Sequence, residues 1–141
     1  MSKTVLAFGS FDIVHPGHLS YLEKARKLGD RLIVIVARDS SIRMFKHRNP
    51  AFSEGDRVRL IGSLKPVDLA VLGNRVKGKE GIYKILKRFR PGVIALGYDQ
   101  RVDEKELKAR LAEYGIKSRI VRIGMRKSEA RYKSSKLSRF L

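Results

Sequence analysis

The residues best suited to catalysis lie together near the N-terminus. Two of the three histidines, His15 and His18, stand three residues apart in the segment Gly9-Ser10-Phe11-Asp12-Ile13-Val14-His15-Pro16-Gly17-His18. An imidazole can donate a hydrogen bond to a phosphate oxygen, and the transition state of phosphoryl-type transfer spreads negative charge over such oxygens. The pair therefore indicates chemistry at a phosphate group.

The residues around the histidines favour the same chemistry. Gly9 follows an apolar run, and a glycine at a strand end lets the backbone approach an anion closely. Pro16 presets the entry into a helix, and Gly17 leaves room above the turn for a ligand. The free amides at the start of a helix, together with the positive end of its dipole, favour phosphate.

Two other interpretations of the histidines are open. Taken singly, each is more often an ordinary surface or core residue than a functional one. A metal site would need further ligands, and no cysteine, third histidine or paired carboxylate stands beside them. Their joint position in a glycine-flanked turn between a strand and a helix favours the phosphate interpretation.

The elements that must position this segment alternate along the chain. Apolar or alternating runs predict strands at 4–8, 32–36, 68–72, 93–96 and 118–123. Amphipathic patterns predict helices from Pro16 to a stop at Gly29, from Ser53 past Leu64, over 82–89, and from Asp103 to Gly115. The polar, basic segment 38–52 predicts a loop. This order predicts a single α/β domain over 1–141, doubly wound and Rossmann-like, with a parallel five-stranded sheet and helices on both faces.

In such a sheet, ligands bind beyond the carboxyl ends of the strands, where the strand order reverses. The loops to examine therefore follow Phe8, Val36, Leu72 and Leu96. The histidine segment lies in the first of these loops.

Composition narrows the class of protein further. The chain has 141 residues, no cysteine and a formal net charge of +18, so disulfide frameworks and thiolate catalysis are excluded. The longest apolar run, 32–37, is too short to span a membrane, and a cytoplasmic location is expected. Asparagine and glutamine are scarce, which suggests a thermophilic source. Residues 117–141 carry nine basic and one acidic side chain (9 − 1 = +8), so they attract an anion unless they form a solvated tail.

Two motifs carry a family resemblance. Gly9-Ser10-Phe11-Asp12 followed by His15-x-Gly17-His18 resembles the signature of the cytidylyltransferase-like nucleotidyltransferases, which transfer a nucleoside monophosphate to a phosphorylated acceptor and release pyrophosphate. Gly97-Tyr98-Asp99-Gln100 resembles the archaeal FAD synthases, which transfer AMP from ATP to FMN. The glycerol-3-phosphate cytidylyltransferases, similar in size and in the histidine motif, are the alternative.

The resemblance implies a role for particular residues. It makes His15, His18 and Lys46 catalytic, although Lys46 could equally be a solvated loop lysine. It places Asp12 and Arg57 at the acceptor, although Arg57 could equally serve solubility. The residues that it assigns to nucleotide binding are Gly9, Ser10, Phe11, His15, Pro16, Gly17, His18, Asp99, Arg126, Ser134 and Ser135.

Two of the nucleotide-binding assignments carry a qualification. Arg126 is followed by Lys127-Ser128-Glu129, without the threonine and glycine that the family has there, so its alignment is open by about a residue. Asp99 could instead cap a turn.

The implied mechanism is direct in-line attack of the acceptor phosphate on the α-phosphorus of the nucleotide. ATP and FMN are the implied substrates, and Mg²⁺ would enter with ATP, held largely by phosphate oxygens and water. A homodimer is also compatible with the sequence. Outside the enzyme class, the charge of +18 is compatible with a nucleic-acid-binding domain, but few aromatic residues stand outside apolar strand and helix positions.

Overall fold

The computed structural model describes residues 3–74, 80–98 and 100–124. Their five strands are β1 (Thr4–Gly9), β2 (Arg31–Val36), β3 (Leu69–Leu72), β4 (Val93–Gly97) and β5 (Arg119–Ile123). Their five helices are α1 (Pro16–Arg26), α2 (Asp39–Lys46), α3 (Glu54–Gly62), α4 (Glu80–Phe89) and α5 (Glu104–Glu113).

The strands form one sheet in the order β3-β2-β1-β4-β5, and every neighbouring pair is parallel. The order reverses between β1 and β4, because β1 pairs with β2 on one side and with β4 on the other. All carboxyl ends therefore lie at one edge, and a switch point lies between β1 and β4 at that edge. This confirms the predicted five-stranded parallel sheet.

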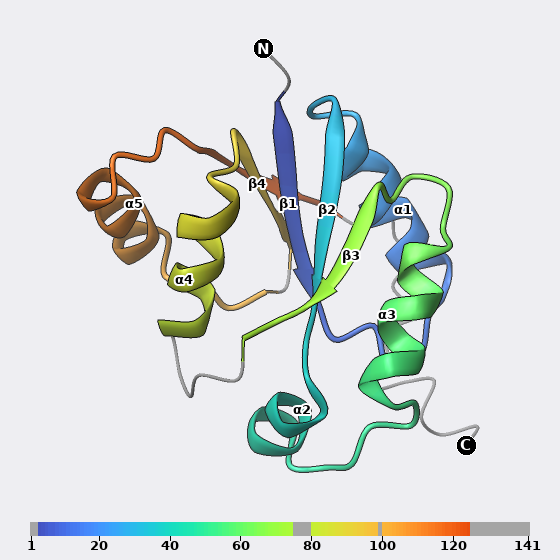
Figure 1. Cartoon of the computed structure of the whole chain (residues 1–141). Helices are drawn as coiled ribbons and strands as arrows, with labels where there is room; N and C mark the ends of the chain where they lie inside the picture. Colours follow the sequence, from blue (N-terminus) through green and yellow to red (C-terminus); the bar gives the residue numbers. More distant parts are fainter. Residues whose placement is uncertain (1–2, 75–79, 99, 125–141) are drawn as a thin grey trace.

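Helices cover both faces of the sheet (Figure 1). On the face with α1 and α3, Val5 and Ala7 of β1 pack in one buried cluster with Leu22 and Ile61. On the face with α4 and α5, Leu6 belongs to a second cluster with neighbours from β2, β4 and both helices. Successive residues of a strand point to opposite faces, so a central strand covered on both faces is apolar at every position.

The predicted helix starts agree with the capping contacts. Ser53 Oγ accepts the Asp56 amide at 3.2 Å, and a carboxylate oxygen of Asp103 accepts the amides of Lys105 and Glu106 at 3.1 Å each. These bonds satisfy amides that have no partner within the helix. The first helix ends at Arg26, three residues before the predicted stop at Gly29.

Residues 39–46 differ from the prediction, because the segment expected to be a loop contains α2. Its first turn has no side-chain cap from Arg38, so the usual local signal for a helix start is missing. The carboxylate of Glu54 supplies the cap from a distance: it accepts the Asp39 amide at 3.0 Å and pairs with Arg38 at 3.0 Å. Ile42 is the one buried side chain of this helix. In Figure 1, α2 lies beyond the carboxyl ends of β1, β2 and β3.

Candidate active site

The turn between β1 and α1 is built around a close backbone–ring contact. Phe11 has a left-handed backbone (φ 50°) and is 2 % exposed. A Cβ at Gly9 would lie 2.6 Å from the Phe11 ring, so only glycine fits beneath it. The ring meets His18 edge-on, with centroids 5.3 Å apart. A strained residue held by packing is common where a turn is shaped for a ligand.

The two histidines cap α1 through their own side chains. His15 is the N-cap residue, and its Nδ1 accepts the Gly17 amide at 3.1 Å. His18 Nδ1 accepts the His15 amide at 3.3 Å. Because each Nδ1 is an acceptor, the hydrogen-bond pattern assigns the proton of each neutral ring to Nε2. The rings stack with centroids 3.7 Å apart, so the turn carries two paired Nε2–H donors.

The site holds both imidazoles in the neutral form at pH 7. Burial lowers the pKa of His15 below its ordinary value. Burial, followed by the charges of His15 and Lys46, lowers the pKa of His18 to about 3. Two stacked rings could not both be protonated without strong repulsion, so neutrality also fits the geometry.

The pKa of His18 predicts how stability depends on pH. In the unfolded chain, His18 has a pKa near 6.5 and becomes protonated below that pH. In the folded chain, His18 becomes protonated only near pH 3, so the unfolded state binds one more proton between these two pH values. The contribution of neutral His18 to the free energy of unfolding is therefore fully present above pH 6.5 and is lost as the pH falls toward 3. Denaturant unfolding of the wild type and of His18→Asn between pH 7 and 4 should show a steeper loss in the wild type. Identical slopes would contradict the assigned pKa.

Lys46 reaches the same turn from α2. Its Nζ lies 2.8 Å from Ser10 Oγ, although the two residues are 36 positions apart in the sequence. The structure thus brings together Ser10 and all three residues predicted to be catalytic, and it gives the site a cation beside the neutral imidazoles.

Asp12 points into the protein, where it binds the loop that follows α2. It is 1 % exposed, and its carboxylate accepts the amides of Ala51 (2.9 Å) and Phe52 (3.0 Å) and pairs with Arg48 (2.9 Å). Burial alone would raise the pKa of Asp12, but these two amides and the Arg48 guanidinium together hold it below its ordinary value. Asp12 therefore stays charged and fixes this loop to the turn of residues 10–18 between β1 and the first residues of α1, which we call the histidine turn.

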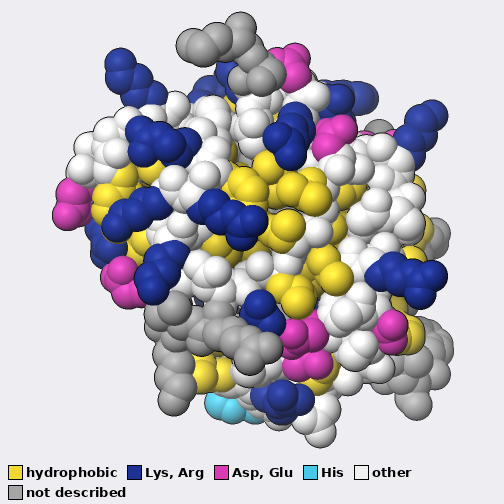
Figure 2. All heavy atoms as spheres, viewed as in Figure 1, with side chains coloured by type: hydrophobic (Ala, Val, Ile, Leu, Met, Phe, Trp, Pro, Cys, Tyr) yellow, Lys and Arg dark blue, Asp and Glu magenta, His cyan; other side chains and the backbone are white. Residues whose placement is uncertain are grey.

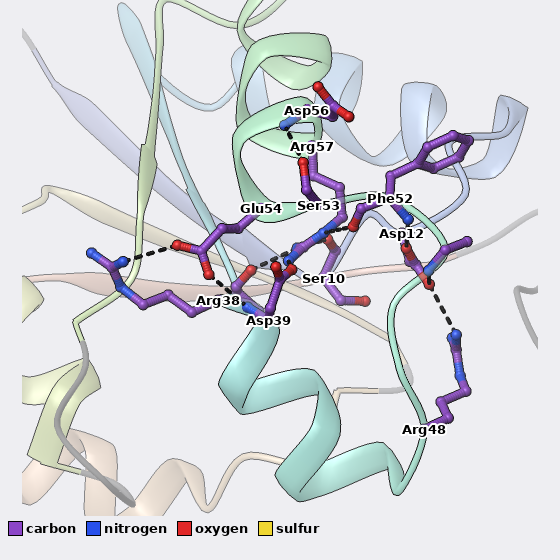
Figure 3. A network of polar contacts seen from close by, with 12 residues as sticks. Ser10, Asp12, Arg38, Asp39, Arg48, Phe52, Ser53, Glu54, Asp56 and Arg57 are labelled. Atoms are coloured by element: carbon purple, nitrogen blue, oxygen red, sulfur yellow. Dashed lines mark hydrogen bonds and ion pairs between the residues drawn. The ribbon is translucent and has the colours of Figure 1, made fainter.

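Arg57 of α3 is also turned inward, and its side chain has no exposed surface. Its guanidinium donates to the carbonyls of Phe52 (3.0 Å), Ser10 (2.8 Å) and Ala37 (2.6 Å), and it pairs with Asp39 at 2.7 Å. Figure 3 shows this guanidinium between the histidine turn and the start of α2. One rigid group with several donors thus joins β1, β2, α2 and α3 at the carboxyl edge.

Direct contact of Asp12 and Arg57 with an acceptor stays a prediction. In the structure, the polar atoms of both side chains contact protein groups, and both residues are buried. Their observed role is to hold in place the backbone that carries Ser10 and the start of α2.

The direct pairing of β1 with β4 stops before their carboxyl ends. The register ends with Ala7 opposite Ala95. Beyond this pair, the Tyr21 hydroxyl of α1 lies between the two strands. It accepts the Phe8 amide at 3.4 Å and donates to the Ala95 carbonyl at 2.6 Å.

Gln100 occupies the next position between the two strands. Its Oε1 accepts the Gly97 amide at 3.0 Å, and its Nε2 donates to the Phe8 carbonyl at 2.7 Å. In a continued parallel ladder, Phe8 would bond directly to Ala95 and Gly97. Tyr21 and Gln100 are inserted into these two bonds and so hold the strands apart at the switch point.

Sequence reasoning missed these roles. Gln100 belongs to the tetrapeptide noted above, but its partner on β1 lies 92 positions away. Arg122 of β5 was missed as well: it donates to the carbonyls of Gly97 (2.9 Å) and Gln100 (2.5 Å) and pairs with Glu104 at 3.3 Å, so it holds the β4–α5 loop. No local pattern signals such contacts.

Removing the Tyr21 hydroxyl tests the insertion between β1 and β4. Tyr21→Phe leaves the Phe8 amide and the Ala95 carbonyl without their bridge, and an unmade buried hydrogen bond costs about 1–3 kcal/mol. We expect the free energy of unfolding in urea to fall by about that amount. An unchanged value would mean that the strands close into a direct ladder and that the hydroxyl does not hold them apart.

Several residues predicted to bind nucleotide lie outside the described residues: Asp99, Arg126, Ser134 and Ser135. Within residues 3–74, 80–98 and 100–124, no group of three histidine, aspartate or glutamate side chains could hold a metal ion. No helix in the same part of the chain is long and apolar enough to cross a membrane.

A parallel sheet with a switch point, and a paired-histidine turn beside it, define a doubly wound α/β protein with a candidate phosphate site at the carboxyl edge of the sheet. The chain belongs to the cytidylyltransferase-like family, whose model matches residues 6–140. Its relatives include proteins named FAD synthase. The one from Archaeoglobus profundus is 48% identical over 132 residues, which are 93% of this chain and 80% of the relative. The one from Aciduliprofundum boonei is 50% identical over 119 residues, 84% of this chain and 76% of the relative.

Two solved structures have a similar fold. A protein from Thermoplasma volcanium, described as a lipopolysaccharide core biosynthesis protein, is 42% identical, with a TM-score of 0.82 over 90% of this chain and 100% of its own. Pantoate-beta-alanine ligase from Francisella tularensis is 16% identical, with a TM-score of 0.60 over 95% of this chain and 66% of its own, and it shares the fold. The family resemblance predicted from the two motifs is confirmed.

Proposed function

We propose that this protein transfers AMP from ATP to FMN, giving FAD and pyrophosphate. The observation that carries the proposal is the histidine turn: two neutral imidazoles with protons assigned to Nε2, and Lys46 beside Ser10, at the carboxyl edge of β1. The similarity to FAD synthases over most of both chains supports FMN as the acceptor.

The reaction is an in-line displacement. A phosphate oxygen of FMN attacks the α-phosphorus of ATP, the new P–O bond forms, and the bond from the α-phosphorus to the bridging oxygen of the β-phosphate breaks. Pyrophosphate leaves with that electron pair. The acceptor phosphate is already ionised at neutral pH, so no side chain needs to remove a proton from it.

The residues of the site supply positioning and charge stabilisation. The Nε2–H groups of His15 and His18 donate to oxygens at the α-phosphate, where negative charge develops. Lys46 offsets the repulsion between the two polyanions. The first amides of α1 already have acceptors within the turn, because Gly17 donates to His15 Nδ1 and His18 donates to the His15 carbonyl. The helix therefore acts on the same anionic group through the positive end of its dipole. Arg57 holds the Ser10 backbone in place by donating to its carbonyl.

Mg²⁺ entering with ATP is part of the proposal, and when bound it would neutralise charge on the phosphates. The described residues do not form a cage for it. The carboxylate in the histidine turn, that of Asp12, is buried and already accepts hydrogen bonds from three donors in the loop after α2, so it does not face a Mg²⁺ ion. A cytoplasmic location and a homodimer stay predictions.

Product analysis tests the function. The protein is incubated with Mg²⁺ and either ATP plus FMN or CTP plus glycerol 3-phosphate, and products are separated by chromatography with pyrophosphate measured in parallel. We expect FAD and equimolar pyrophosphate in the first mixture. If CDP-glycerol forms in the second mixture and no FAD forms in the first, FMN is rejected as the acceptor. Nucleotidyl transfer would still be the reaction class.

The basic surface is the feature that favours a nucleic-acid partner. Figure 2 shows Lys and Arg side chains scattered around one face, with hydrophobic side chains gathered at its centre. Nucleic-acid surfaces interleave basic residues with aromatic platforms, so a nucleic-acid-binding domain stays the alternative outside the enzyme class. Salt-dependent binding of RNA or DNA by the protein would favour that alternative.

A further inference from the structure

A cavity of about 320 Å³ lies between α4, α5 and the carboxyl half of β4. Its deep walls are the buried side chains of Leu86, Ile94, Leu96 and Leu107. The volume is within the range of small-molecule sites. None of the roles described so far uses this cavity.

The helices that enclose the cavity are tied together at their outer ends. Arg110 of α5 makes two hydrogen bonds to Glu80 of α4, at 3.2 and 3.1 Å. The same guanidinium lies over the ring of Tyr83, 4.0 Å from its centroid. This contact spans α4 and α5 beside the cavity, so the space is preformed and does not depend on a ligand to separate the helices.

The cavity borders the switch point. Phe8, which lines it, directly precedes Gly9 of the histidine turn. Gln100, which also lines it, bridges β1 and β4 at their carboxyl ends. A molecule with its ring in the cavity and its phosphate at the histidine turn would therefore lie across the end of β1.

The chemistry of the walls discriminates between the rings of the two substrates. Burying a polar group without a hydrogen-bond partner is costly. Adenine carries nitrogen atoms around most of its edge, and the apolar walls of Leu86, Ile94 and Leu107 offer them no partners. One end of the isoalloxazine ring system is a dimethylbenzene, which is hydrocarbon throughout, and the other end is a polar pyrimidine. Four polar or charged residues line the cavity as well: Gln100, Arg101, Asp103 and Glu106. The amide of Gln100 and the guanidinium of Arg101 suit the second end.

We propose that this cavity receives the isoalloxazine ring of FMN, with the dimethylbenzene end between α4 and α5 and the pyrimidine end toward Gln100 and Arg101. This inference rests on the proposed function and names the part of the protein that recognises the acceptor. FMN then differs from simpler phosphorylated alcohols in having a ring that fills an apolar space.

Filling the cavity tests the proposal. Leu107→Phe adds bulk to a deep wall, and Val102→Phe adds bulk in the half-buried loop before α5. The control is Leu69→Phe, the same kind of change at the exposed start of β3. For each full-length protein, FMN affinity is measured from quenching of flavin fluorescence, ATP affinity by calorimetry, and folding by thermal melting.

We expect both filled variants to bind FMN about 10- to 200-fold more weakly, the range that a small misfit produces in a hydrophobic pocket. Their ATP affinity and the properties of Leu69→Phe should stay at the wild-type level. If Leu107→Phe fails to fold, Val102→Phe decides.

Two results would overturn the cavity proposal while the proposed function stands: folded variants that bind FMN as the wild type does, or variants that lose ATP affinity and keep FMN affinity. A wild-type protein that neither binds FMN nor forms FAD would instead reject the proposed function and the cavity proposal with it.

Discussion

His15→Asn and His18→Asn are expected to lower kcat by about 10²-fold or more and to leave folding nearly intact. Asparagine places an oxygen where each histidine has Nδ1, so it can still accept the Gly17 or the His15 amide that caps α1. It has no group at the position of Nε2, so the donor proposed for the α-phosphate is lost. The change therefore separates the capping role of each histidine from its proposed catalytic role.

The measurements are kcat for FAD formation and the free energy of unfolding for each variant. His15→Ala and His18→Ala should lose the same activity and, in addition, about 1 kcal/mol of stability with the cap. His47→Asn is the matched control, because His47 is exposed and its left-handed backbone (φ 54°) suits asparagine. Wild-type kcat in either asparagine variant would remove that histidine from the catalytic set.

Arg57→Ala is expected to have the largest effect on stability, a loss of about 3–5 kcal/mol in the free energy of unfolding. The substitution leaves Asp39 without its ion pair and the carbonyls of Ser10, Ala37 and Phe52 without their shared donor. Arg57→Lys should recover only part of the loss, because one ammonium group cannot reach acceptors spread around a planar guanidinium.

The control for Arg57 is Arg59→Ala, the same change two residues along α3 at an exposed position. Urea unfolding gives the stability, and steady-state kinetics gives KM for FMN. A stable Arg57→Ala variant with a raised KM for FMN would contradict the positioning role and would favour the direct acceptor contact predicted from the family resemblance.

The sequence by itself determined the sheet, four of the five described helices and the position of the histidine turn. Each of these features has a local signal, in which the residues that form the signal lie within a few positions of one another. The examples are the apolar run of β2, the cap at Ser53, and the two histidines around Pro16 and Gly17. A motif in a strand-to-helix turn must lie at the carboxyl edge of a parallel sheet, so the site could be placed before its geometry was known.

Only the tertiary structure decided how the site is held together. The start of helix α2 is capped by Glu54, which lies 15 positions from the amide that it accepts. The guanidinium of Arg57 donates to acceptors up to 47 positions away in the sequence. Tyr21 and Gln100 bridge strands through contacts separated by 74 and 92 positions. Such bonds form because packing brings distant groups to one edge, where a buried donor must find an acceptor. A buried arginine and an exposed one look alike in the sequence, and only the fold distinguishes them.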